Sequence, residues 1–159
     1  MAKRILMPLD EAVPPERTIE AVAAQARAAG ATVRLLHVAA RTDNILDEDG
    51  HVIAYSDQET ARVEAETIDY LHAASIPLDG VAVEYAVRFG DPVARILEEA
   101  DDWNADLIAM TTRGRSCIGR ALLGSVAEQV FRRAATAVTL FRAERERTAW
   151  RPRTEGDTR

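Results

Sequence analysis

The sequence predicts a single α/β domain in which a parallel sheet carries helices on both faces. Short apolar segments of strand length alternate along the chain with segments whose apolar residues recur at helical spacing. The expected strands are almost continuously apolar, which is typical of parallel strands that are covered on both faces. The chain has 159 residues, of which 47% are hydrophobic, and this is enough for one buried core.

The N-terminal half is expected to supply two strands and two helices. The expected elements are strands at 4–9 and 32–39, helices at 14–29 and 57–74, and a mobile polar loop at 41–56. Pro14 and Pro15 suit the first turn of a helix, and Gly30 suits the position just after its end. His37 lies inside the second strand and is expected to be a packed, hydrogen-bonded side chain.

The C-terminal half continues the alternation. The expected elements are strands at 80–87, 106–111 and 137–141, a helix that opens at 91–92, and a helix at 125–134. Asp91 is the expected N-cap of the first of these helices, with Pro92 at its first position. Ser125 and Glu128 have the spacing of a capping box at the start of the second. Ligands of such sheets bind beyond the carboxyl ends of the strands.

Composition argues against several classes of function. The net charge of −6 and the pI near 5.1 argue against general binding to nucleic acid or to an anionic membrane. Cys117 is the only cysteine, which excludes an intrachain disulfide and any site with several cysteine ligands. Lys3 is the only lysine, and its terminal position argues against a P-loop or Schiff-base lysine. The three histidines form no close ligand pair, so no metal site is expected. The N-terminus has no apolar signal core, so a cytoplasmic location is expected.

The segment from Met110 to Ser125 carries the strongest chemical signal. Gly114 and Gly124 are nine residues apart, and Ser125 follows at an expected helix start. Free amides at a helix N-terminus, together with a serine hydroxyl, favour an anion. Positive charge is added by Arg113, Arg115 and Arg120. The segment therefore predicts a phosphate-binding loop.

Five segments carry a resemblance to a known family. They are ILMPLD, LLHV, GDPVARILEEA, DLIAMTTRGRS and ALLGSVAEQV. With these segments, residues 3–142 resemble the universal stress proteins, single-domain members of the adenine nucleotide α-hydrolase-like superfamily. The resemblance implies a Rossmann-like fold with five parallel strands in the order 3-2-1-4-5. It also implies ATP at the carboxyl edge of the sheet and a homodimer formed through the strand at 137–141.

The family signature G-x2-G-x9-G-(S/T) can be carried over residue by residue. Its second and third glycines fall on Gly114 and Gly124, whereas the first falls on Thr111. The resemblance implies a nucleotide site made of Leu9, Asp10, Val38, Met110, Thr111, Arg113, Gly114, Arg115, Gly124, Ser125 and Val126. Asp10 would lie near adenine or ribose, and Val38 would meet adenine partly through its backbone. If position 111 needs an unusual backbone angle or extra room, threonine impairs binding; if it needs only a small residue, the hydroxyl could bond the nucleotide.

The resulting expectation is a stress-response or signalling module that binds ATP or a related adenine nucleotide. Residues 1–143 would form the domain, and residues 144–159 a charged, disordered tail. Two alternatives stay open: a non-nucleotide interaction protein of the same fold, and a weak ATPase with Mg²⁺ bridging the phosphates. No catalytic residue is assigned, because the chain lacks the SGG-x-DS and H-x-G-H motifs of the superfamily's catalytic branches. Protein partners beyond a second copy are unknown, and neither nucleic acid nor a membrane is expected as a partner.

Overall fold

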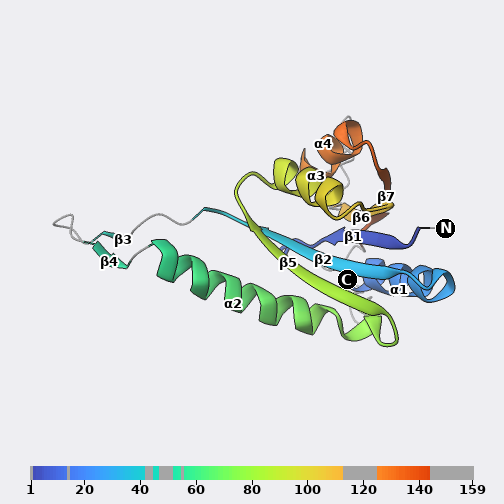
Figure 1. Ribbon diagram of the computed structural model, residues 1–159, viewed down its shortest axis with the longest axis horizontal. Helices are drawn as coiled ribbons and strands as arrows, with labels where there is room; N and C mark the ends of the chain where they lie inside the picture. The colour runs from blue at the N-terminus through green and yellow to red at the C-terminus, as the bar shows by residue number, and fades with distance from the viewer. Residues whose placement is uncertain are drawn as a thin grey trace, which may run out of the picture.

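A parallel five-stranded sheet forms the centre of the molecule (Figure 1). The computed structural model describes residues 2–13, 15–41, 45–46, 52–54, 56–112 and 125–143, with the backbone alone for 45–46, 52–54, 56 and 125. The five strands are β1 (Arg4–Pro8), β2 (Thr32–Ala39), β5 (Ala82–Phe89), β6 (Leu107–Thr112) and β7 (Ala137–Arg142). Their order across the sheet is β5-β2-β1-β6-β7, and all neighbours are parallel. The predicted order 3-2-1-4-5 is therefore confirmed.

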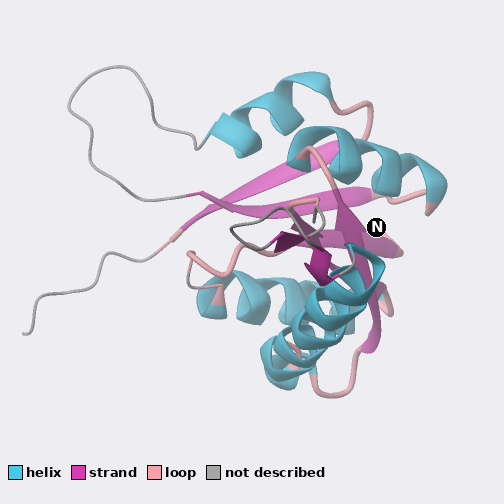
Figure 2. Cartoon of the chain, turned by 90° about the vertical axis from the view of Figure 1, so that its left-hand side faces the viewer, coloured by secondary structure: helices cyan, strands magenta, loops and turns pink. Residues whose placement is uncertain are grey.

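Helices cover both faces of this sheet, as predicted (Figure 2). The helices are α1 (Glu16–Ala29), α2 (Ser56–Ala74), α3 (Pro92–Asp102) and α4 (Ser125–Arg133), with a short 3₁₀ helix η1 (Ile76–Leu78) after α2. One apolar core joins the sheet to α1 and α2 and includes Ile19, Val33 and Leu71. The other joins the sheet to α3 and α4 and includes Leu36, Ile96 and Val130. The sheet is thus buried between two apolar layers, which explains its nearly continuous apolar strands.

The segment expected to be a loop at 41–56 contains two short strands. β3 (Ile45–Leu46) and β4 (Val52–Ala54) form an antiparallel pair outside the main sheet, near the start of α2 (Figure 1). Strands of two and three residues are too short to show a periodic hydrophobic pattern. The polar composition of residues 41–56 therefore predicts a loop.

Two helix boundaries follow the local sequence signals, whereas α1 begins at Glu16, with Pro15 at its N-cap and not in its first turn. Gly30 ends α1 in the left-handed conformation, with φ of 60°, and the amide of Ala31 bonds back to the carbonyl of Ala26 at 2.9 Å. The Asp91 side chain caps α3 by accepting from the amide of Ala94 at 2.9 Å, and Pro92 takes the first helical position. Both predicted helix signals are therefore confirmed.

A buried carboxylate lies between the sheet and α3. The Glu99 side chain is 1% exposed, and its two oxygens each lie 2.6 Å from an arginine nitrogen, one of Arg34 and one of Arg88. The contact to Arg34 is a hydrogen bond, whereas the contact to Arg88 is an ion pair without hydrogen-bond geometry. Arg34 also pairs with Glu84, and its guanidinium lies 4.4 Å from the centre of the Trp103 ring. Two arginines thus neutralise one buried charge.

Candidate functional site

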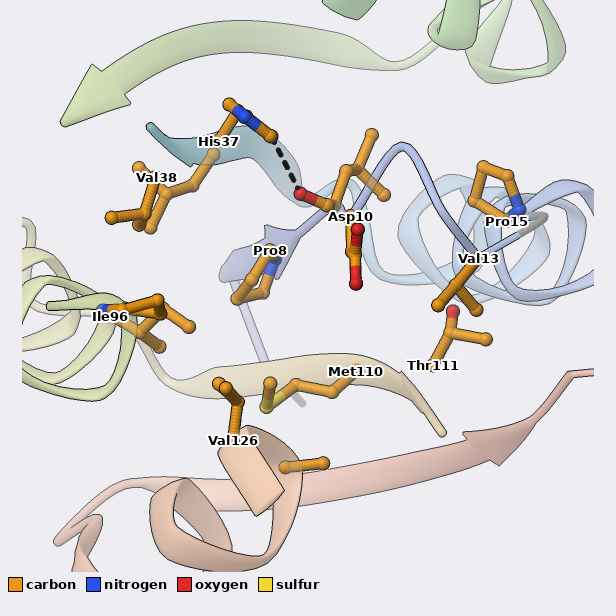
Figure 3. Close-up of a pocket in the computed structure, with 14 residues that line it drawn as sticks. Pro8, Asp10, Val13, Pro15, His37, Val38, Ile96, Met110, Thr111 and Val126 are labelled. Atoms are coloured by element: carbon orange, nitrogen blue, oxygen red, sulfur yellow. Dashed lines mark hydrogen bonds between the residues drawn. The ribbon is translucent and has the colours of Figure 1, made fainter. Parts of the chain in front are cut away.

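A cavity of about 440 Å³ opens at the carboxyl ends of β1, β2 and β6 (Figure 3). It lies at the topological switch point, because β2 and β6 flank β1 on opposite sides and the chain crosses to the other side of β1 after β5. The described residues that line it are Pro8, Leu9, Asp10, Val13, Pro15, Leu36, His37, Val38, Pro92, Ile96, Met110, Thr111, Val126 and Ala127. Asp10, His37 and Thr111 are the polar side chains among them, so the walls are largely apolar. A cavity of this size and lining suits a small organic ligand.

Asp10 is held at the cavity by the turn between β1 and α1. Its carboxylate accepts a hydrogen bond from the amide of Ala12 at 2.9 Å, and its carbonyl accepts from the amide of Val13 at 2.9 Å. These bonds form a tight turn in which the side chain of the first residue replaces a backbone acceptor. Asp10 therefore supports the local turn and also lines the cavity, as Figure 3 shows.

The surroundings of this turn are acidic. Tyr70 of α2 has a buried hydroxyl with no hydrogen-bond partner among the described residues. Burial raises the pKa of the Tyr70 hydroxyl, and the nearby charges of Glu11, Asp10 and Glu16 raise it further. The same charges disfavour a ligand anion at this side of the cavity.

Thr111 occupies an ordinary strand position. It pairs with Phe141 in the ladder between β6 and β7. Asn104 is the one non-glycine residue with a positive φ in the described part of the chain, so Thr111 needs no left-handed backbone. Its hydroxyl donates to the hydroxyl of Thr18 on α1 at 2.8 Å. The alternative in which position 111 demands an unusual backbone angle therefore finds no support in this fold.

The structure brings together six of the eleven predicted site residues. Leu9, Asp10, Val38, Met110, Thr111 and Val126 all line the cavity. Arg113, Gly114, Arg115 and Gly124 lie outside the described residues, as do Cys117 and the side chain of Ser125. Glu128 forms an ion pair with Arg132 at 2.7 Å. The serine side chain of the predicted capping box lies outside the described residues, so the capping box stays a prediction.

Sequence reasoning missed much of the apolar lining. The additional lining residues are the polar His37 and seven apolar residues, Pro8, Val13, Pro15, Leu36, Pro92, Ile96 and Ala127. Pro92 and Ile96 could have been found, because the Asp91 cap starts α3 directly after β5 and so places its first turns at the carboxyl edge of the sheet. Val13 and Pro15 carry no comparable signal, since their positions depend on the path of the turn.

The fold and the cavity define a doubly wound α/β protein with a ligand-sized site at its switch point. A family model described as the universal stress protein family matches residues 1–142, and the chain belongs to this family. The similar curated protein from Thermus aquaticus, "Universal stress protein in QAH/OAS sulfhydrylase 3'region", is 31% identical over 143 residues, which is 89% of this chain and 100% of the relative.

Solved structures share the fold. A universal stress protein in complex with cAMP superposes with a TM-score of 0.60 at 23% identity, over 89% of this chain and 97% of that chain. The universal stress protein from Archaeoglobus fulgidus in complex with dAMP superposes with a TM-score of 0.62 at 22% identity, over 86% and 95%. No helix in the described ranges is long and apolar enough to cross a membrane.

Proposed function

We propose that this protein binds an adenine nucleotide in the cavity between β1 and β6 and acts as a stress-response or signalling module. The observation that carries the proposal is an apolar cavity of about 440 Å³ at the switch point of a doubly wound sheet. The complexes of related folds with cAMP and dAMP support the adenine nucleotide as the ligand class.

Electrostatics suggest how the ligand is oriented. The base suits the apolar walls formed by Val38, Ile96 and Met110, with the backbone of Val38 beside its edge. Because Asp10 belongs to an acidic turn, it suits neutral ribose hydroxyls or the base and disfavours phosphate. The phosphates then point toward the start of α4, where Val126 lines the cavity and a helix N-terminus attracts anions.

The proposed phosphate residues come from the family signature. The phosphates of ATP would be surrounded by Gly114, Arg115, Gly124 and Ser125, with Arg113 nearby. Mg²⁺ would accompany the phosphates as their counter-ion. ATP and adenosine monophosphates remain candidates for the bound nucleotide, because the base and sugar can use the same cavity. The proposal places the protein in the cytoplasm, where these nucleotides are made and consumed.

A second copy of the chain is the proposed partner. β7 is an edge strand of the main sheet, so one row of its backbone groups has no partner within that sheet. Pairing between two copies through residues 137–141 would cover this row. A symmetric arrangement of this kind is the common way in which small proteins close an exposed edge.

The proposal is tested first on freshly purified protein. Heat denaturation followed by mass spectrometry is expected to release an adenine nucleotide, and calorimetric titration of stripped protein is expected to show one site for ATP, AMP or cAMP. Gly124→Val should weaken phosphate-dependent binding without changing the circular dichroism spectrum. Failure to bind any of the three nucleotides would contradict the proposal and favour a non-nucleotide interaction protein.

A further inference from the structure

The hydrogen-bond ladder between β1 and β2 is interrupted beside the cavity. In β2, the carbonyl of Leu36 faces β1 and accepts from the amide of Leu9 at 2.8 Å, whereas the carbonyl of Ala39 faces β5 and accepts from Gly90 at 3.0 Å. Since backbone groups alternate sides along a strand, the amide and carbonyl of Val38 face β1. The next rung of a parallel ladder would be the Val38 amide donating to the carbonyl of Leu9.

A side chain replaces this rung. The Nδ1 atom of His37 lies 3.0 Å from the carbonyl oxygen of Leu9, and the Val38 amide does not bond that oxygen. Because a carbonyl can only accept, Nδ1 carries the proton and donates. The dashed line in Figure 3 marks this bond. The imidazole is further held by the ring of Tyr70, which meets it edge-on at 6.3 Å between centroids.

The cavity lies where the missing rung would be. Leu9, His37 and Val38 all line it, and β1 has ended at Pro8. The amide and carbonyl of Val38 therefore face the ligand space as an adjacent donor and acceptor. Such a pair matches the edge of adenine, which offers a ring-nitrogen acceptor beside an exocyclic amino donor. Hypoxanthine presents the reverse order and would place donor against donor.

We propose that His37 is a positioning residue that holds the carbonyl of Leu9 so that the Val38 backbone stays available to select a 6-aminopurine. The inference rests on the proposed function and adds a residue to which the family signature gives no role. Without the Nδ1 donor, the Leu9 carbonyl lacks its partner, and the nearest replacement is the Val38 amide. That bond would complete the ladder, preserve the fold and withdraw the donor from the base.

Three substitutions separate this role from simple packing. His37→Asn places an amide nitrogen at the position of Nδ1 and keeps the donor. His37→Gln places its amide nitrogen farther out, near the position of Nε2, and His37→Leu has no donor. Tyr70→Phe is the matched control, because it keeps the ring beside His37 and removes only a hydroxyl that has no partner among the described residues.

The first readout needs no ligand. In ¹⁵N spectra of the nucleotide-free protein, His37 is expected to be the tautomer with hydrogen on Nδ1. Hydrogen exchange of the Val38 amide should be fast in the wild type, His37→Asn and Tyr70→Phe. In His37→Gln and His37→Leu it should slow by about tenfold or more, because the amide becomes bonded. An equal exchange rate in all five proteins would overturn the proposal.

The second readout compares AMP with IMP by calorimetry. The wild type, His37→Asn and Tyr70→Phe should prefer AMP by similar factors. His37→Gln and His37→Leu should lose about tenfold in AMP affinity and most of the preference over IMP. Retention of the full AMP-to-IMP ratio in His37→Leu would contradict the inference. If the wild type binds no adenine nucleotide, the proposed function fails, and amide exchange alone decides the role of His37.

Discussion

The hydroxyl of Thr111, at the end of β6, donates a hydrogen bond of 2.8 Å to the hydroxyl of Thr18 in α1. Thr18 is buried, so this contact joins the sheet edge to a helix inside the core. It lies where the family signature has its first glycine. The bond turns the polar end of Thr111 toward α1, and this is how a β-branched residue is accommodated at the cavity wall.

The first prediction concerns this hydroxyl pair. Thr111→Val keeps the shape of the side chain but removes the donor, so the hydroxyl of Thr18 loses its partner. The free energy of unfolding should therefore fall by about 1–2 kcal/mol in urea titrations.

Thr111→Gly tests the family signature directly, because glycine is the residue that the signature has at this position. Since position 111 needs no positive φ, we expect its calorimetric affinity for AMP to stay within about threefold of the wild type. An increase of tenfold or more would show that the threonine obstructs the ligand.

The second prediction concerns Asp10. Asp10→Asn keeps an oxygen that can accept from the Ala12 amide, so the turn should persist while the negative charge is lost. Loss of a charged acceptor should weaken AMP binding by about tenfold in calorimetry. Glu11→Gln removes a neighbouring charge outside the cavity lining and should leave affinity nearly unchanged. If both substitutions weaken AMP binding equally, the loss of affinity comes from the negative charge of the acidic turn and not from a contact between Asp10 and the nucleotide.

The third prediction concerns the buried carboxylate. Glu99→Gln leaves Arg34 and Arg88 without their shared counter-charge, and the free energy of unfolding should fall by about 3 kcal/mol. Glu98→Gln is the control on the adjacent residue, whose ion pair with Arg95 is at the surface. Its effect should stay below about 0.5 kcal/mol. Similar urea midpoints for both variants would show that Arg34 and Arg88 are adequately solvated without Glu99.

The fourth prediction is a pH dependence set by Asp106. The amides of Lys3 and Arg4 donate to its carboxylate at 2.8 and 2.9 Å, and these bonds lower the pKa of Asp106. The stabilisation is complete above the unfolded-state pKa of about 3.9 and disappears as the pH falls through the lower folded-state pKa. The difference in urea midpoint between wild type and Asp106→Asn should therefore be constant from about pH 5 to 7 and shrink below about pH 4. A constant difference down to about pH 2.5 would contradict this assignment.

The fifth prediction concerns the second copy. Light scattering should give the wild type twice the chain mass of 17.5 kDa. Glutamate at the exposed positions Ala137 and Thr139 of β7 should produce monomers, because like charges on a shared edge repel. Ala82→Glu on β5, at the opposite edge of the sheet, should leave the dimer intact. A dimer that survives both changes in β7 would place the interface elsewhere.

Strong local signals made most of the fold predictable. Gly30 and the pair Asp91-Pro92 set helix ends through backbone conformation and capping, which depend on only a few neighbouring residues. The β3–β4 pair was missed because it is too short to have a period. The burial of Glu99 was also missed, since the neutralisation of this α3 residue requires Arg34 of β2 and Arg88 of β5.

The candidate site was predictable where it follows strand ends. Asp10 follows from the rule that ligands bind at the carboxyl edge, whereas Val38 comes from the family resemblance, and both line the cavity. The bond between His37 and Leu9 could not be predicted beyond the expectation of a hydrogen-bonded histidine, because its acceptor exists only once β1 has ended beside β2. The hydroxyl pair of Thr111 and Thr18 likewise depends on how α1 packs against β6.

The central place of β1 has a consequence for synthesis on the ribosome. β1, which precedes the other described strands along the chain, is flanked by β2 and β6, and the contact of Lys3 with Asp106 spans 103 residues of sequence. A nascent chain that ends before Leu107 can assemble only three of the five strands of the sheet, β1, β2 and β5, with one side of β1 open. The late pairing of β6 with β1 slows folding, because the two strands are far apart in sequence. Until then, the open edge of β1 is exposed to a chaperone or a neighbouring chain. The cavity is completed only after β6 and α4 have both been made, because Val126 and Ala127 of α4 also line it, so an intact ligand site reports that translation has passed residue 127.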